Sequence, residues 1–177
     1  MSSNIINLLW ESFLETILMV GVSGGLGAAI GIPLGVFLFV TSPKGIMPKP
    51  YVNRIIGTVV NAVRSTPFII LLVAIIPFTR LIVGSSIGTV AAIVPLTIAA
   101  APLIARLVET SLREVDKGLI EAAQSMGATN TQIICKVLIP EAMPGILAGL
   151  TIAFVALVGS SAMAGAVGAK YLAGNHL

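Results

Sequence analysis

Apolar residues occur in four long, nearly uninterrupted runs, and most polar residues lie in the segments between them. The runs cover residues 13–40, 55–78, 81–105 and 142–167. Each run exceeds the roughly 20 residues that a helix needs to cross the hydrocarbon core of a bilayer. The pattern therefore predicts an all-α polytopic membrane protein in which residues 1–177 form one domain with four transmembrane helices.

Small residues recur within the first predicted span. Gly24 and Ala28, and likewise Gly27 and Gly31, are separated by four positions. Residues at this spacing share a helix face, and their small size allows a neighbouring helix to approach closely. We expect this face to pack inside the helix bundle.

Composition supports the membrane assignment. Apolar residues make up 56% of the chain and charged residues 10%, with a mean hydropathy of +1.06. Soluble domains carry about 25% charged residues, so this chain lacks the polar surface of a water-soluble globule. Its single cysteine, Cys135, excludes a disulfide framework and a multi-cysteine zinc site, and we interpret it as a buried apolar residue. We expect no metal and no cofactor.

The positions of the basic residues predict the orientation. Of the ten Lys and Arg residues, three lie in segment 41–54 and four in segment 106–141: Lys44, Lys49, Arg54, Arg106, Arg113, Lys117 and Lys136. No basic residue precedes Lys44, which also argues against a cleaved signal peptide. The positive-inside rule places both basic segments in the cytoplasm and the N-terminus outside.

The second span contains a charge and a predicted break. At the bilayer centre Arg64 would cost about 2.5–3.5 kcal/mol. It either extends to the cytoplasmic headgroups or acts as a structural or gating charge that faces the bundle interior. The string Arg64-Ser65-Thr66-Pro67 predicts a local break, with Ser65 or Thr66 capping a helix that restarts with Pro67 in its first turn.

The connection 106–141 differs in composition from the spans and reads as helical. It holds four basic and five acidic residues, a net charge of −1. Asp116 is a suitable N-cap for a helix that begins near Lys117, and Gly127 is a suitable stop. Within this helix one face is expected to carry Leu119, Ala122, Ala123 and Met126.

A second helix is expected to follow directly. Thr129-Asn130-Thr131-Gln132 is a capping-box pattern, and Pro140 is expected to end the helix. Its apolar face comprises Ile133, Ile134, Val137 and Leu138.

Three roles are open to such a helix pair. It can lie on the membrane surface, bind DNA or dock on a soluble partner. The net negative charge argues against nucleic acid. Membrane-surface helices usually carry many Lys and Arg residues, so docking is favoured.

The same connection resembles the EAA loop of ABC-importer permeases. The resemblance rests on Glu121-Ala122-Ala123, Gly127 and Val137-Leu138-Ile139-Pro140. The family has Ile and Leu where this chain has Val137 and Ile139. Further strings at 64–73, 91–97, 118–122 and 157–163 resemble the permease subunit of methionine ABC importers, and the likeness extends from about residue 7 to Gly168.

The resemblance implies a function and its partners. It implies a permease of the bacterial cytoplasmic membrane, surrounded by lipid, that forms a homodimer and imports D- or L-methionine. A cytoplasmic ABC ATPase dimer would hydrolyse ATP, so the permease itself is not an enzyme, and an extracytoplasmic binding protein would deliver substrate.

The resemblance also implies roles for particular residues. ATPase coupling is expected to involve Glu121, Ala122, Ala123, Gly127, Val137, Ile139 and Pro140. Candidates for the translocation path are Ser160, Ser161 and Met163 on the fourth span, where ordinary packing is the alternative. Arg64 and Pro67 are candidates for a structural or gating role.

The family pattern has five spans, and the match here runs only through residues 165–169. We therefore expect a chain truncated after the fourth span, with its last helix missing and both ends outside. Two alternatives to a methionine importer follow: a truncated, non-transporting permease remnant, or an importer permease for another small amino acid.

Overall fold

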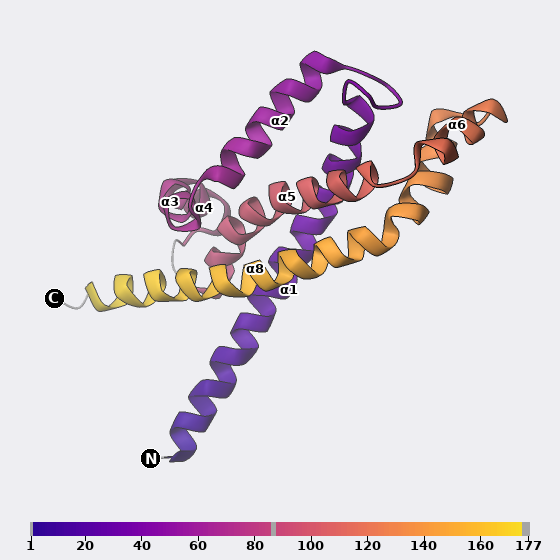
Figure 1. The fold of residues 1–177 in the computed structure, drawn as a ribbon. Helices are drawn as coiled ribbons and strands as arrows, with labels where there is room; N and C mark the ends of the chain where they lie inside the picture. Colours follow the sequence, from indigo (N-terminus) through magenta and orange to yellow (C-terminus); the bar gives the residue numbers. More distant parts are fainter. Residues whose placement is uncertain (1, 86–87, 175–177) are drawn as a thin grey trace.

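The computed structural model describes residues 2–85 and 88–174, and its regular elements in these ranges are helices (Figure 1). In chain order these are α1 (Ser2–Thr41), α2 (Pro50–Ser65), α3 (Phe68–Ala74), α4 (Ile76–Val83), α5 (Thr89–Arg113), α6 (Lys117–Ser125), α7 (Asn130–Ile133), the π-helix η1 (Ile134–Leu138) and α8 (Ile139–Gly174). The all-α fold class is confirmed.

Three helical stretches are long and apolar enough to cross a membrane: Ile5–Thr41, Thr89–Arg113 and Asn130–Gly165. The pair α2 and α3 passes the same test together but is bent by 105°, so the described residues hold three candidate spans, or four if this pair is one span.

The bundle core is built around α5, which packs against both α1 and α8 (Figure 1). One side of α5 is almost fully buried and contributes Leu96, Ala100, Ile104, Val108 and Leu112. Residues from α1 and α8 belong to the same cluster: Met19, Val20, Ala142, Ile146, Ala153 and Leu157. The three longest helices thus share one apolar core.

Glycines on α1 set the distance between α1 and α5. A Cβ atom placed on Gly31 would lie 2.7 Å from the carbonyl oxygen of Ala101, and one on Gly35 would lie 2.5 Å from that of Ala105. Such contacts are far too short, so only residues without a side chain fit there. The expected close packing along the small-residue face of α1 is confirmed, and Gly24 extends it to α8, where it faces Phe154.

The predicted break in the second span is present, but its capping differs from the prediction. Thr66 is extended (ψ 125°), as expected before a proline, and Pro67 is the N-cap of α3 and not part of its first turn. The hydroxyls of Ser65 and Thr66 donate to the carbonyl oxygen of Ala62, at 3.0 and 2.9 Å. Both side chains therefore satisfy the end of α2, and α3 has no side-chain cap.

The third span begins and ends later than residues 81–105. The chain first forms the separate short helix α4, which ends at Gly84 with φ 78°. Gly88, with φ 108°, then precedes α5. At its other end α5 continues to Arg113, so the first eight residues of the expected loop 106–141 (106–113) are helical, and its last three (139–141) lie in α8.

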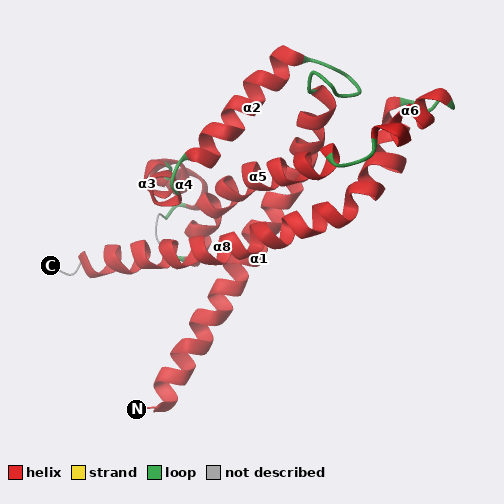
Figure 2. Cartoon of the chain, in the orientation of Figure 1, coloured by secondary structure: helices red, strands yellow, loops and turns green. Residues whose placement is uncertain are grey.

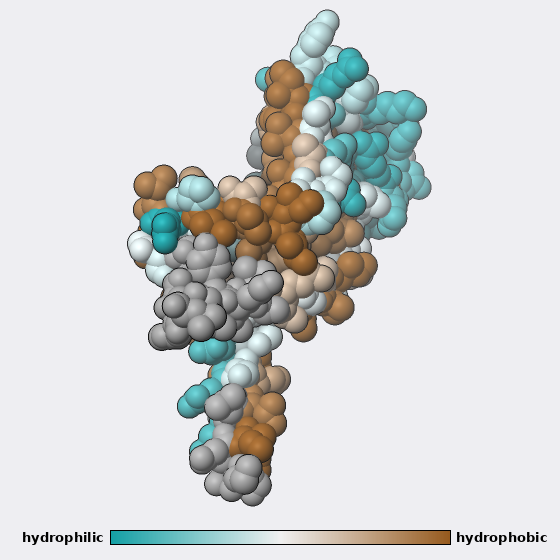
Figure 3. All heavy atoms as spheres, turned by 90° about the vertical axis from the view of Figure 1, so that its left-hand side faces the viewer, coloured by the Kyte–Doolittle hydropathy of each residue, from teal (hydrophilic) through white to brown (hydrophobic). Residues whose placement is uncertain are grey.

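Loops and polar residues gather at one end of the molecule. The connections from α1 to α2 and from α5 to α6 lie at the same end (Figure 2). On the face drawn in Figure 3, hydrophilic residues gather toward the end where α2 begins, and hydrophobic residues cover much of the remainder. This polar end carries the segment between α5 and α8.

Candidate functional site

The helix α6 is capped by hydrogen bonds at both ends. At its start the Oδ1 atom of Asp116 accepts from the backbone N–H of Gly118 at 2.7 Å. At its end Gly127 has φ 78° and donates to Gln124 O at 2.9 Å, while Ala128 donates to Ala123 O at 3.1 Å. These two bonds form a Schellman motif, so the predictions for Asp116 and Gly127 are confirmed.

The residues that α6 buries differ from those predicted to share its apolar face. Ala123 is buried at 5% exposure and packs in the bundle core. Leu119 and Met126, which were expected to share that face, are 42% and 83% exposed, and Ala122 is exposed as well. Ile120 is the partly buried neighbour of Ala123 instead. The helix therefore presents a second, outward surface that includes Glu121 and Ala122.

The next segment joins α6 to α8 and is held by a capping box and by buried apolar residues. Thr129 and Gln132 form both bonds of the predicted capping box, with Thr129 N–H donating to Gln132 Oε1 at 2.9 Å. Ile133 and Leu138 are fully buried, and Ile134 and Val137 pack against the same core, so the predicted apolar face is confirmed.

Two expectations for this segment are wrong. Pro140 does not end a helix but lies in the first turn of α8, directly after the π-helix η1. In the wider turn of η1, Ile139 N–H donates to Ile134 O. This turn lets the helix continue through Pro140, which has no backbone N–H to donate. Cys135 is exposed on this turn and not buried.

The residues expected to couple to an ATPase thus come together at one end of the fold. Ala123 shares a core cluster with Leu138, and α6 contacts η1. Glu121 and Pro140 are exposed, whereas Val137 and Ile139 are half-buried. The arrangement is a small helical unit with an exposed outer surface and an inner surface that packs in the bundle core.

A charged triad on α5 was not foreseen from the sequence. Glu109 is 3% exposed; its Oε2 lies 2.5 Å from an Arg106 nitrogen and its Oε1 lies 2.6 Å from an Arg113 nitrogen. Arg106 also donates to the carbonyl oxygen of Gly57 at 2.9 Å, which links α5 to α2. The i, i+3 and i, i+4 spacings of these residues were the available signal.

The candidate path residues on α8 point in different directions. Ser161 is 3% exposed and donates to Val158 O at 2.8 Å, whereas Ser160 is half-buried and donates to Ala156 O at 3.1 Å. Met163 is 46% exposed. Both hydroxyls are thus satisfied within their own helix.

Arg64 is exposed in the last turn of α2, directly before the break at Pro67. Among the described residues it forms no ion pair. No group of three His, Cys, Asp or Glu side chains in the described ranges is arranged to hold a metal ion. His176 lies outside the described residues.

Comparison with known proteins gives a consistent result. Residues 31–174 match the family model described as "Binding-protein-dependent transport system inner membrane component". A probable D-methionine transport system permease protein of Vibrio cholerae is 57% identical over 162 residues, which cover 92% of this chain and 72% of that protein. The methionine import system permease protein of Bacillus subtilis is 48% identical, over 90% of this chain and 72% of that protein.

Solved structures agree with these sequence matches. A chain in an inward-facing crystal structure of the MetNI methionine ABC transporter is 55% identical with a TM-score of 0.93, covering 96% of this chain and 78% of that chain. A chain from an amino acid ABC transporter has a TM-score of 0.64 at 23% identity over 92% of this chain and 76% of that chain, which is a likeness of fold alone.

Proposed function

The chain belongs to the family of binding-protein-dependent transport system inner membrane components, and from this premise we propose that it is the permease subunit of an ATP-driven methionine importer. The observation that carries the proposal is the 55% identity and TM-score of 0.93 with a chain of the MetNI methionine ABC transporter. The permease is a multi-pass protein of the bacterial inner membrane. ATP hydrolysis belongs to a separate ATPase subunit.

The outward surface of α6 docks on that ATPase. Glu121 and Ala122 are exposed there, and both ends of the helix are capped, so α6 moves as a unit when the ATPase dimer closes on ATP. Ala123 on the inward side packs in the same core cluster as Leu138 and the α5 residues. Closure of the ATPase dimer is thereby transmitted through Ala123 and η1 to α5 and α8.

The polar end of the molecule faces the cytoplasm and the N-terminus faces outside. The basic residues that follow α1, together with those around α6, lie at that end, as the positive-inside rule requires. Methionine then enters from the opposite side, delivered by an extracytoplasmic binding protein to a pathway between two copies of the permease.

Arg64 faces this pathway and does not extend to the cytoplasmic headgroups. It lies 14 residues after Pro50, about 21 Å along α2 at 1.5 Å per residue, in a hydrocarbon core about 30 Å thick. A charge at that depth needs a partner or water. Ser160 and Met163 contribute to the path from α8, and the break at Pro67 gives α2 and α3 a hinge on which to gate it.

Uptake of labelled methionine by cells whose only methionine permease is this chain tests the proposal. We expect saturable uptake that requires the ATPase and is lost in the Glu121→Lys variant. A matched Glu114→Lys variant changes an exposed acid outside α6 and is expected to retain uptake. Background uptake, with the permease present in the membrane, would refute the proposal. Preferential uptake of another amino acid would identify that amino acid, and not methionine, as the substrate.

A further inference from the structure

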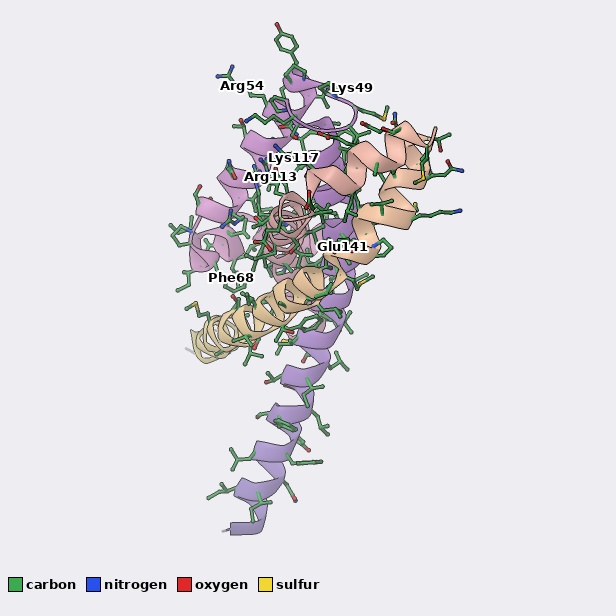
Figure 4. The ribbon with its side chains drawn as sticks, turned by 45° about the vertical axis from the view of Figure 1, so that its right-hand side comes forward. Lys49, Arg54, Phe68, Arg113, Lys117 and Glu141 are labelled. Atoms are coloured by element: carbon green, nitrogen blue, oxygen red, sulfur yellow. The ribbon has the colours of Figure 1, made fainter. Side chains whose placement is uncertain are left out.

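A cavity of about 470 Å³ lies between the loop after α1, the end of α5 and α6. Its lining carries cationic side chains from all three segments: Lys44, Arg113 and Lys117. Figure 4 shows Arg113 and Lys117 close together, at the end of the molecule that also holds Lys49 and Arg54. The cavity therefore joins separate parts of the chain at one positively charged place.

The positive charge of this cavity is only partly compensated within the described residues. Arg113 is paired with Glu109, but neither Lys44 nor Lys117 forms an ion pair in the described ranges. Glu121, an exposed residue that lies both on the outward surface of α6 and at the cavity, is the one acidic side chain among the residues that line the cavity. The lining thus carries a net positive charge that suits an anionic group.

The cavity also has an apolar wall. Phe39, Ile46 and Leu112 line it, and all three are buried or half-buried in the bundle core. It opens where two candidate spans end, because α1 ends at Thr41 and α5 at Arg113. In the orientation proposed above, this end of the spans lies at the level of the cytoplasmic lipid headgroups.

We propose that this cavity binds the phosphate headgroup of an anionic phospholipid of the cytoplasmic leaflet. Lys44 and Lys117 contact the phosphate, and the wall of Phe39 and Ile46 receives the glycerol and the first methylene groups of the acyl chains. Basic pockets beside the cytoplasmic ends of spans are suited to such headgroups. The assignment of the leaflet rests on the orientation given under the proposed function.

The lipid would join the loop after α1 to α6. Because α6 is also the surface proposed to dock the ATPase, a bound headgroup holds α6 against the bundle when the ATPase is absent or open. A free phosphate ion carries the same charge but cannot use the apolar wall, so the two ligands can be distinguished by experiment.

The test is lipid titration of the purified permease complex in detergent, followed by native mass spectrometry. The probes are phosphatidylglycerol, phosphatidylcholine and inorganic phosphate. We expect phosphatidylglycerol to bind in preference to phosphatidylcholine. Lys44→Gln and Lys117→Gln are each expected to weaken the binding of phosphatidylglycerol about fivefold. The double variant is expected to weaken it about 25-fold.

A charge-matched control is available in the same region. Lys49→Gln with Lys136→Gln removes two exposed basic residues that do not line the cavity, and this pair is expected to leave lipid binding unchanged. Gln124→Trp fills the cavity without removing a charge and is expected to weaken binding. It keeps the test decisive if the double Lys variant does not fold.

Equal affinity of the parent, the cavity variants and the control pair would overturn the proposal. Displacement of phosphatidylglycerol by millimolar inorganic phosphate would identify a free anion as the ligand and would also overturn it. A protein that binds the lipid as expected but does not import methionine would refute the proposed function and leave the site intact.

Discussion

The close contact between α1 and α5 yields the sharpest prediction, because it depends on the absence of one Cβ atom. In the Gly35→Ala variant that atom would lie 2.5 Å from Ala105 O and 2.8 Å from Val108 Cβ. The first contact is to backbone, which cannot rotate away, so the two helices must separate. Overpacking of this kind costs about 1–3 kcal/mol.

A matched control removes the other effect of the substitution. Alanine has a higher helix propensity than glycine by about 0.8–1.0 kcal/mol, which stabilises any helical variant. Gly25 lies in the same helix, and a Cβ atom there meets nothing within 4 Å. Gly25→Ala therefore gains helix propensity without the clash. The difference in stability between the two variants then gives the cost of the clash alone.

Thermal unfolding of both variants in detergent, followed by circular dichroism at the helix band, measures this difference. Gly35→Ala is expected to unfold about 2–12 °C below Gly25→Ala. For a chain of this length, each kcal/mol of unfolding free energy changes the unfolding temperature by about 2–4 °C. Equal unfolding temperatures would refute the reasoning, since they would mean that α1 and α5 do not approach as closely as described.

Other predictions concern the charged triad and the coupling segment. Glu109→Gln removes the buried charge that pairs with Arg106 and Arg113 and is expected to lower the free energy of unfolding by about 1–3 kcal/mol, whereas Glu114→Gln, at an exposed residue with no ion pair among the described ones, should lower it little. Glu121→Lys places the opposite charge on the outer surface of α6 and should abolish co-purification with the ATPase; unchanged co-purification would count against docking there. Gly127→Pro should do the same, because proline cannot adopt φ 78°, and a retained ATPase would show that the Schellman turn is dispensable. Thr129→Ala removes the capping box and should lower stability by about 0.5–2 kcal/mol, measured by the same thermal unfolding.

The sequence predicts local features of this fold well. Asp116, Gly127 and Thr129 act within a few residues of their own positions, so the ends of α6 and the start of α7 follow from the chain alone. The break at Pro67 is equally local, since proline forces the preceding residue out of the helical region.

Features that depend on packing were harder to predict. Leu119 and Ala123 are both apolar or small residues on one short helix, and only the position of α6 against η1 decides that Ala123 is buried and Leu119 exposed. The sequence places the end of the third span too early, because charged residues such as Arg106 and Glu109 are typical of a loop. In the fold these charges neutralise each other inside α5.

The proposed path residues depend on contacts outside a single chain. Arg64 and Met163 are exposed here, and a pathway between two permease copies is where their surroundings would be completed. No pattern along the sequence specifies which side chain of one copy faces the other.

Transport by the reconstituted complex tests the central claim most directly. The permease and its ATPase are placed in proteoliposomes with the binding protein on the outside, and accumulation of labelled methionine is measured with and without ATP inside. We predict accumulation that requires ATP and is lost with a hydrolysis-deficient ATPase. Equal methionine content with and without ATP, in vesicles that contain the assembled complex, would contradict the account.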